Sequence, residues 1–201
     1  MPPETTPLTP ADDPFALFSE WLAEADAGEP GLPHAMSLAT VAASGTPSLR
    51  MVLLKGADER GFVFYTNSGS RKVDEIEETG AAALCFHWKS VRRQVRIEGR
   101  VERVGDAEAD AYWAGRPRDA QIGAWASRQS QPYAARAELE AEVAACERRF
   151  AGRPVPRPEF WTGYRVVPAR IEFWREQPSR LHDRLVYTRA AQGWTTQWLN
   201  P

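Results

Sequence analysis

The sequence RMVLLKGADERGFVFYTNSGSRK at residues 50–72 decides the fold and holds the first candidate site. Its two apolar runs, RMVLLK and FVFYT, flank a polar turn that contains glycine, which predicts a pair of β-strands. The second run leads into a Ser-Gly-Ser turn followed by Arg71 and Lys72. Free backbone N–H groups and hydroxyls beside two cations suit a dianionic phosphate. A hairpin with a solvated basic turn is the alternative, and this stretch alone does not decide between them.

The composition is typical of a globular protein with one domain. The chain has 201 residues, of which 43% are hydrophobic and 26% are charged, enough for one sizeable core. A formal net charge of −2 argues against general nucleic-acid binding, so any anion site must be a local cluster. No stretch approaches the roughly 20 apolar residues that span a bilayer, and no signal pattern is present. We therefore predict a cytoplasmic protein.

Periodicity predicts short antiparallel strands with flanking helices. Strands are expected at 36–42, 47–55, 62–66, 81–88, 94–104, 161–167, 170–174, 185–188 and 194–199. Helices are expected at 14–28, 71–79, 120–126 and 139–150, with another capped by Asp106. The short spacing of the strands, without a βαβ alternation, indicates an antiparallel barrel. Residues 1–12 are polar and rich in proline and predict a flexible arm, which leaves 13–201 as a single domain.

Several kinds of active site are absent from the sequence. There is no phosphate-binding P-loop, no dinucleotide-binding glycine motif, no G-x-S-x-G and no Cys/His set with zinc spacing. No metal site is predicted. Cys85 and Cys146 are expected to be buried, reduced thiols. An enzyme with this sequence would therefore depend on a bound organic cofactor.

A second group of polar residues lies between residues 111 and 130. Tyr112 and Arg116 are four positions apart, so they are expected to share a helix face and to suit a second phosphate. Gln129 and Ser130 follow a predicted helix and could hydrogen-bond the heteroatoms of a ring. Together with the basic turn, these residues indicate two anion sites and hence two phosphorylated ligands.

The third group is the segment SRLHDR at 179–184. On an extended backbone Arg180, His182 and Arg184 would project to the same side. Two guanidiniums and an imidazole on one face suit an anion or a polar ring. The alternative is an exposed edge strand with a mixed-charge face. The other two histidines, His34 and His87, are expected to be structural.

These motifs resemble those of a known family. RMVLLK, FYTNSGSRK, RRQVRIEG, RPRDAQIGAWAS with QS, EFW and SRLHDR occur in the order and with the spacing of the pyridoxamine/pyridoxine 5′-phosphate oxidases. The resemblance covers about residues 13–201. It implies a mainly β protein with flanking helices, an antiparallel split β-barrel that forms a homodimer and binds FMN at the subunit interface. It also implies oxidation of pyridoxamine or pyridoxine 5′-phosphate to pyridoxal 5′-phosphate, with O₂ as electron acceptor and H₂O₂ as product.

The resemblance also implies a role for each matching residue. The implied FMN contacts, several of them from the partner subunit, are Arg50, Met51, Val52, Leu53, Leu54, Lys55, Tyr65, Thr66, Arg71, Lys72, Gln94, Gln129, Ser130, Trp174 and Arg184. The implied substrate contacts are Lys55, Tyr112, Arg116, Arg180, Leu181 and His182. Arg180 and His182 would be the catalytic pair, lying against the pyridine ring and placing its C4′ carbon over flavin N5.

Three departures from the family pattern keep alternatives open. Ala120 replaces a serine that helps to hold the substrate phosphate, Trp198 stands where the family has a C-terminal arginine, and residues 1–12 lack Arg, Lys and Tyr. One alternative is a related flavin oxidase, similar to those of phenazine biosynthesis. Another is a protein that binds a flavin or pyridoxal phosphate without turnover. Retention of Tyr112, Arg116, Arg180 and His182 favours the vitamin B6 substrate.

Overall fold

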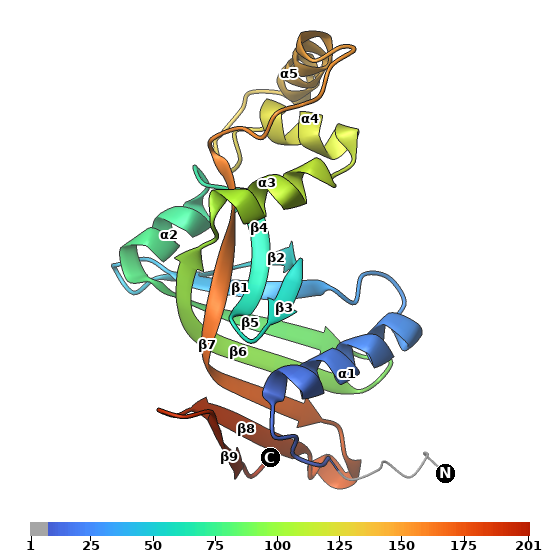
Figure 1. The fold of residues 1–201 in the computed structure, drawn as a ribbon, viewed down its shortest axis with the longest axis vertical. Coiled ribbons are helices and arrows are strands. Elements are labelled where there is room, and N and C mark those ends of the chain that lie inside the picture. The colour runs from blue at the N-terminus through green and yellow to red at the C-terminus, as the bar shows by residue number, and fades with distance from the viewer. Residues whose placement is uncertain (1–7) are drawn as a thin grey trace.

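A curled sheet of nine antiparallel strands forms the centre of the computed structural model, which describes residues 8–201 (Figure 1). The strands are β1 Ala35–Val41, β2 Pro47–Leu53, β3 Gly56–Asp58, β4 Gly61–Asn67, β5 Ala81–Trp88, β6 Arg93–Arg103, β7 Trp161–Arg175, β8 Asp183–Arg189 and β9 Trp194–Trp198. The helices are α1 Pro14–Gly28, α2 Arg71–Thr79, α3 Asp106–Ala114, α4 Arg118–Ala126 and α5 Arg136–Arg149, with a 3₁₀ turn at Pro178–Arg180.

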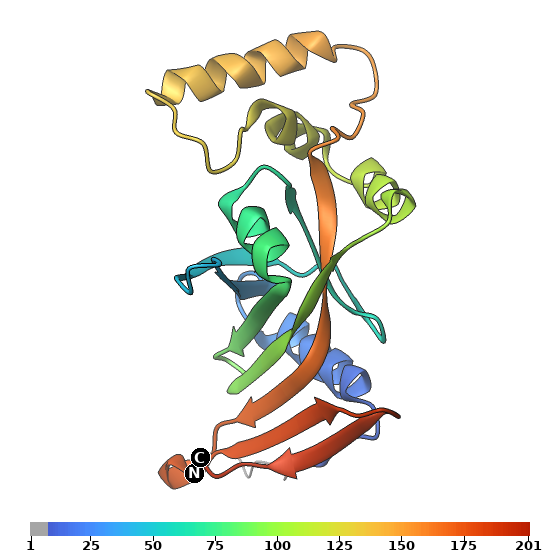
Figure 2. The same cartoon turned by 90° about the vertical axis from the view of Figure 1, so that its left-hand side faces the viewer.

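The strand order is β2-β1-β5-β6-β7-β4-β3, with β8 paired to β7 and β9 paired to β8. This topology confirms the predicted antiparallel split barrel. Helices α3, α4 and α5 lie at one end of the molecule, and β8 and β9 lie at the other (Figures 1 and 2). The long strand β7 connects the two ends.

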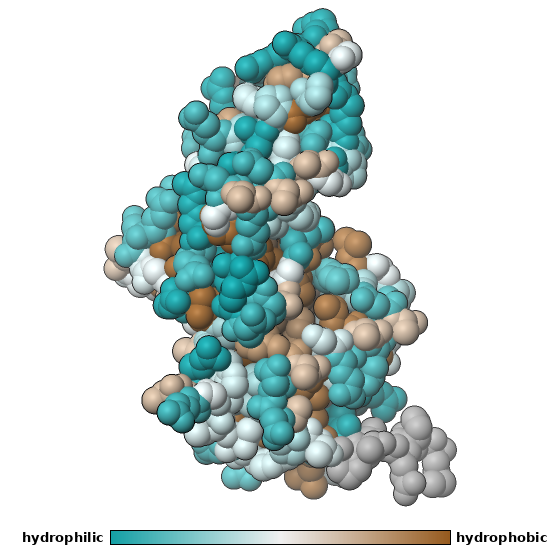
Figure 3. All heavy atoms as spheres, viewed as in Figure 1, coloured by the Kyte–Doolittle hydropathy of each residue, from teal (hydrophilic) through white to brown (hydrophobic). Residues whose placement is uncertain are grey.

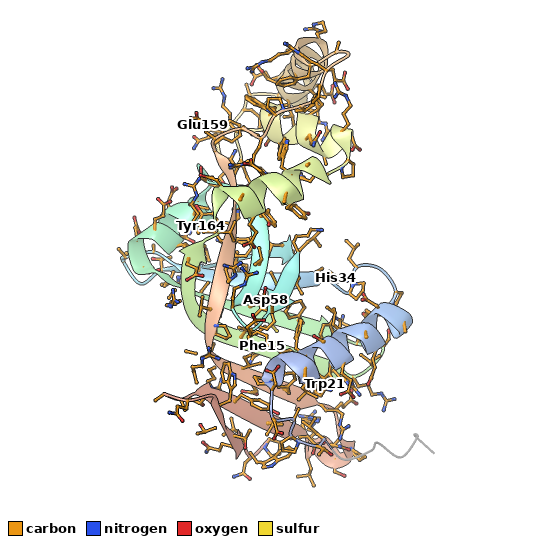
Figure 4. The ribbon with its side chains drawn as sticks, in the orientation of Figure 1. Phe15, Trp21, His34, Asp58, Glu159 and Tyr164 are labelled. Carbon is orange, nitrogen blue, oxygen red and sulfur yellow. The ribbon has the colours of Figure 1, made fainter. Side chains whose placement is uncertain are left out.

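Helix α1 covers one side of the barrel because its apolar residues recur at helical spacing. The Asp13 carboxylate accepts the Phe15 N–H at 3.0 Å and caps the helix, followed by Pro14 at its first position. Phe15 and Phe18 pack their rings on Phe62 of β4, with centroids 5.4 and 4.9 Å away (Figure 4). These contacts join the N-terminal helix to the main core.

Strand β7 is one strand of 15 residues where the sequence predicted two. The interruption suggested by Pro168 is absorbed by a bulge, because Glu98 pairs with Arg170 while Gly99 pairs with Pro168. Ala169 is the extra residue. A Cβ on Gly99 would lie 2.0 Å from the Val167 carbonyl oxygen, so glycine is needed at this bulge.

Part of the predicted arm is packed against the barrel. Leu8 is 7% exposed and belongs to the core, and the Ala11 N–H donates to the Tyr187 hydroxyl at 2.9 Å. Leu8 and Ala11 of the predicted arm therefore contact the barrel, and residues 1–7 lie outside the described part of the chain. Both cysteines are free thiols, with Cys146 buried and Cys85 only half-buried.

The surface is mostly polar, with apolar residues gathered near the middle of the face shown in Figure 3. Along β2 the alternation exposes Leu49, Met51 and Leu53, whose exposed fractions are 68%, 62% and 36%. These three side chains share one face of an edge strand. Within residues 8–201, no helix is both long and apolar enough to cross a membrane.

Candidate cofactor and substrate site

A cavity of about 570 Å³ opens beside β2, β4, α2 and α3. Its lining residues come from all of the N-terminal candidate segments: Arg50, Met51, Val52, Leu53, Lys55, Tyr65, Thr66, Arg71, Lys72, Tyr112, Arg116, Gln129, Ser130 and Trp161. All of them except Trp161 were predicted from the sequence. Leu54 was also predicted but is a core residue, 3% exposed, because the strand alternation turns its side chain inward.

Lys72 lies at the base of this cavity and is 7% exposed. Its Nζ donates to Ser70 Oγ at 2.9 Å, to Gln129 Oε1 at 3.0 Å and to Thr66 Oγ1 at 3.1 Å. Within residues 8–201, no carboxylate pairs with it. Burial, with a smaller contribution from Arg50, lowers the pKa of Lys72 from 10.5 to about 8. A buried ammonium without a paired carboxylate makes this end of the cavity a candidate anion site.

The start of α2 adds further donors to the Lys72 side of the cavity. Ser70 is the N-cap, and the Gly69 N–H donates to the Asn67 side chain at 2.8 Å, which shapes the turn that precedes the helix. Arg71 is the first helical residue. Its side chain adds a guanidinium to the positive end of the helix dipole. The basic turn is therefore part of a cavity wall and not only solvated surface.

Three aromatic rings form the opposite wall. Tyr65 stacks on Tyr112 and on Trp161, with centroids 4.0 and 5.1 Å apart and ring planes within 7° of parallel. Gly163 makes room for this stack, because a Cβ there would lie 2.7 Å from Tyr65 Cε1. Trp161 was missed in the sequence. The sequence places Trp161 at the start of a predicted strand. The structure pairs it there with Asn67 of the FYTN run, which brings it to the cavity.

Arg116 lies on this aromatic wall. Its guanidinium carbon is 4.6 Å from the ring centroid of Trp161 and 5.2 Å from that of Trp113. One terminal nitrogen, Nη1, is buried and has no hydrogen-bond partner among the described residues, and burial lowers the pKa of the group. A buried donor without an acceptor is expected where a ligand oxygen binds.

The predicted geometry of Tyr112 and Arg116 is only partly correct. Helix α3 ends at Ala114, so Arg116 follows the helix and does not share a helix face with Tyr112. Pro117 restricts the residue before it to extended conformations, which accounts for the early end. Both side chains nevertheless line the cavity.

The remaining predicted residues form a second group on β6, β7 and β8. Gln94, Trp174 and Arg184 are aligned neighbours across these three strands. The His182 ring lies 4.7 Å from that of Trp174, and its Nδ1 accepts the Gln177 N–H at 3.1 Å. None of these residues lines the cavity described above.

Arg180 does not lie on an extended strand. It and Ser179 form a turn with φ values of 63° and 58°, and β8 begins only at Asp183. The prediction that Arg180, His182 and Arg184 project to one side by strand alternation is therefore wrong at Arg180. Left-handed conformations in residues other than glycine cost on the order of 1–3 kcal/mol each and occur preferentially at functional sites.

The two groups are far apart within one chain. Trp161, which lines the cavity, and Trp174, which belongs to the second group, lie at opposite ends of β7 (Figure 2). At about 3.3 Å per residue, thirteen residues of strand span roughly 40 Å along the chain. One flavin therefore cannot contact both groups within a single chain.

Two family models match the chain. One described as pyridoxamine 5′-phosphate oxidase matches residues 25–150, and one described as the pyridoxine 5′-phosphate oxidase C-terminal dimerisation region matches residues 161–201. The second match covers β7, β8 and β9 with their connections, and includes Trp174 on β7, Arg184 on β8 and His182 in the segment between them. Trp174, His182 and Arg184 thus lie in the part of the chain that matches a dimerisation region.

Curated proteins and solved structures agree with these matches. A pyridoxine/pyridoxamine 5′-phosphate oxidase from Azorhizobium caulinodans is 60% identical over 90% of this chain and 86% of its own length. A pyridoxine/pyridoxamine 5′-phosphate oxidase from Caulobacter vibrioides is 58% identical over 97% of this chain and 88% of its own length. The structure of PhzG from Burkholderia lata 383, in complex with tetrahydrophenazine-1-carboxylic acid, superposes with a TM-score of 0.90 and is 36% identical in sequence. The similarity covers 96% of this chain and 94% of the PhzG chain. A pyridoxamine 5′-phosphate oxidase-related, FMN-binding protein from Nostoc punctiforme is 18% identical and has a TM-score of 0.74. It shares the fold over 92% of this chain and 96% of its own chain.

Proposed function

This chain belongs to the pyridoxamine 5′-phosphate oxidase family, and on that premise we propose that it oxidises pyridoxamine or pyridoxine 5′-phosphate to pyridoxal 5′-phosphate. FMN is the cofactor, O₂ the electron acceptor and H₂O₂ the reduced product. One observation carries the proposal: a single cavity contains two groups of cations, Arg71 with Lys72 and Lys55 with Arg116. A flavin mononucleotide and a phosphorylated B6 vitamer match that arrangement. A cytoplasmic location stays a prediction from the sequence.

FMN fits the Lys72 end of the cavity. Arg71, Lys72 and Thr66 would bind its phosphate, which would supply the anion that the buried Lys72 ammonium lacks. The β2 segment 50–55 and Gln129 would border the flavin. Bound FMN would supply the redox chemistry, a two-electron oxidation of the substrate at its C4′ carbon with O₂ as the final acceptor. The residues of the chain bind and orient the reactants and need not form a covalent bond.

The substrate phosphate would bind at the other end, between Lys55, Tyr112 and Arg116. A phosphate oxygen would satisfy the buried Arg116 Nη1, which has no acceptor within residues 8–201. The stacking of this guanidinium on Trp161 restricts its rotation before the substrate arrives. Less conformational entropy is then lost on binding, which favours affinity.

A second copy of the chain would complete each site. The chain carries the dimerisation region of the family, and the exposed apolar face of β2 borders the cavity. In a two-fold dimer, Gln94, Trp174 and Arg184 of one copy would face the cavity of the other. Arg180 and His182 would then lie against the pyridine ring. His182 already has its Nδ1 occupied as an acceptor, so its Nε2 is the atom available to the substrate.

Leu49→Glu tests the dimer. This side chain is 68% exposed on β2 and does not line the cavity. Burying a carboxylate at an apolar interface is costly, so we expect a monomer that has lost most of its bound FMN. Sedimentation or light scattering at micromolar concentration measures the oligomeric state, and the flavin absorbance of the same sample measures the bound FMN. Ala145→Glu, on an exposed face of α5, should remain a yellow dimer. A Leu49→Glu monomer with full flavin content would contradict the shared site.

The main rival is a flavin oxidase that acts on another substrate, as the structural similarity to PhzG suggests. The higher identity to curated B6 oxidases and the presence of Tyr112, Arg116, Arg180 and His182 favour the B6 substrate. A flavin spectrum and a peroxide assay with pyridoxamine 5′-phosphate separate the alternatives. We expect yellow protein that releases one H₂O₂ per pyridoxal 5′-phosphate. Yellow protein that makes no peroxide with this substrate would exclude the proposed activity.

Ala120→Ser tests the departure from the family pattern. Ala120 is half-buried in the first turn of α4, and a serine there would add a hydroxyl donor. A hydrogen bond to a charged group contributes about 1.5–3 kcal/mol, so we expect KM for pyridoxamine 5′-phosphate to fall about tenfold with little change in kcat. Ala124→Ser, one helical turn later, is the control and should leave KM unchanged. An unchanged KM in Ala120→Ser would show that the position does not contact the phosphate.

A further inference from the structure

We propose that Glu75 is a positioning residue that holds the guanidinium of Arg71, and behind it that of Arg50, in place for the phosphate of FMN. This inference rests on the proposed function, because it assumes that FMN binds at the Lys72 end of the cavity. Glu75 does not line that cavity. It was not singled out in the sequence, although its spacing of four from Arg71 on a helix is typical of an ion pair.

Glu75 is buried and accepts hydrogen bonds from four side chains. It is 4% exposed, on the inner face of α2. Its Oε1 accepts from Arg71 Nε at 2.8 Å. Its Oε2 accepts from Thr40 Oγ1 at 2.5 Å, from Arg50 Nη2 at 3.3 Å and from the Ser48 hydroxyl. One carboxylate therefore connects α2 with β1 and with β2, and β2 is one of the strands that border the cavity.

The contact to Arg71 leaves the phosphate-binding part of that side chain free. Only Nε donates to Glu75, and no acceptor among residues 8–201 pairs with the two terminal nitrogens. The side chain is 62% exposed and lines the cavity. A guanidinium held through Nε presents its remaining N–H groups as a planar fork that matches phosphate oxygens. Glu75 thereby selects one orientation of an otherwise flexible side chain.

Arg50 is held more completely. Its Nη1 donates to Thr40 Oγ1 and to the Leu38 carbonyl oxygen, and its Nη2 donates to Ser48 Oγ as well as to Glu75. This fixes the first cation of the RMVLLK run against the sheet. The two hydroxyls that contact Arg50 also contact Glu75, so the five side chains form one connected network.

The network keeps Glu75 ionised. Burial alone would raise its pKa, but hydrogen bonds from Ser48, Thr40, Arg71 and Arg50 hold the pKa at about 2. The resulting negative charge offsets repulsion among the cations that surround the phosphate site. The carboxylate thus has two separable effects, its charge and its geometry, and only the geometry positions Arg71.

Two substitutions separate these effects. Glu75→Asp keeps the charge but is one methylene shorter, so it cannot reach Arg71 Nε and the β-strand hydroxyls together. Glu75→Gln keeps the length but loses the charge, and its amide NH₂ cannot accept from any of the four donors. If geometry is decisive, both variants bind FMN more weakly.

The test compares FMN with riboflavin, which lacks only the phosphate. Full-length apoprotein is titrated with each flavin, and binding is followed by flavin fluorescence. We expect Glu75→Asp and Glu75→Gln to weaken FMN binding about tenfold or more, the effect of one charged hydrogen bond, while riboflavin affinity changes less than twofold. Glu77→Gln removes an exposed carboxylate from the same helix and should match wild type for both flavins.

Each other outcome overturns the inference in a distinct way. Parallel loss of FMN and riboflavin affinity would make Glu75 a purely structural residue. If Glu75→Gln bound FMN more tightly than wild type and Glu75→Asp bound it equally well, Glu75 would affect FMN binding only through its charge and would not position Arg71. The assumed phosphate site is tested separately: if Arg71→Ala leaves the FMN-to-riboflavin affinity ratio of the wild type unchanged, the proposed placement of FMN is wrong.

Discussion

Arg180→Ala should lower kcat/KM for pyridoxamine 5′-phosphate by about 100-fold or more while leaving the FMN content unchanged. Arg180 is exposed, and no group among residues 8–201 pairs with its guanidinium. The turn that presents it is in a left-handed conformation, a strained geometry that occurs preferentially at functional sites. We attribute its role to the pyridine ring of the substrate bound by the second copy. Steady-state kinetics and the flavin absorbance of the same preparation measure the two effects.

The controls for Arg180 distinguish its planar fork from its charge. Arg180→Lys keeps the charge but loses the fork, so it should recover only part of kcat/KM. Arg189→Ala removes an exposed arginine from the far end of β8 and should leave both kcat/KM and flavin content unchanged. Loss of FMN in proportion to activity in Arg180→Ala would assign the residue to the cofactor instead.

Lys72→Met should weaken FMN binding by about 100-fold, because it removes a buried ammonium that the phosphate would neutralise. Methionine has a similar length and no charge, so the cavity keeps its shape. Riboflavin affinity should change little. Lys89→Met, on an exposed turn after β5, is the matched control. If Lys72→Met bound FMN as tightly as wild type, the phosphate would have to lie elsewhere.

The lowered pKa of Lys72 also predicts how FMN binding depends on pH. In the apoprotein this lysine is protonated below about pH 8 and becomes neutral above it. A bound phosphate dianion favours the ammonium and raises its pKa again, and the FMN phosphate is already dianionic above about pH 7. Binding above pH 8 must therefore take up a proton, and FMN affinity should fall up to about tenfold per pH unit.

This pH dependence can be measured by isothermal titration at pH 7, 8 and 9. Buffers with different ionisation enthalpies report the number of protons taken up with FMN. For the wild type we expect about zero protons taken up per FMN bound at pH 7, and close to one proton per FMN at pH 9. Lys72→Met should take up none at any pH. Proton uptake that persists in this variant would show that another group titrates.

Local sequence patterns predicted most of the fold. Helix Arg71–Thr79 and strand Ala81–Trp88 have the predicted bounds, because an N-cap serine and a C-terminal glycine delimit the helix by backbone hydrogen bonding. Strand β7 is continuous although two strands were predicted, because Pro168 alone suggests an interruption. The bulge that accommodates Pro168 depends on Gly99 of the neighbouring strand β6.

The cavity residues were predictable for a similar reason. Arg50 lies on β2, Lys55 and Thr66 flank the β3–β4 hairpin, and Arg71 and Lys72 begin α2, so short connections within residues 50–72 bring them together. The two apolar runs of that stretch do not pair with each other, because β2 pairs with β1, and β4 pairs with β3 and β7. Trp161 and Glu75 were missed because their roles arise from contacts across the fold. Trp161 stacks on a ring more than 90 positions away, and Glu75 accepts hydrogen bonds from Thr40 of β1 and Ser48 of β2.

The residue pattern predicted the antiparallel barrel, since strand alternation and turn chemistry act over a few residues. Together with the family resemblance it also predicted the side chains that line the cavity, while the two anion sites stay a prediction. Only the tertiary structure showed that the predicted site residues form two groups at opposite ends of one chain. The 15-residue strand β7 separates Trp161 from Trp174, and a left-handed turn redirects Arg180. Strand length, register and backbone torsion arise from pairing between distant segments, and periodicity along one segment cannot report them.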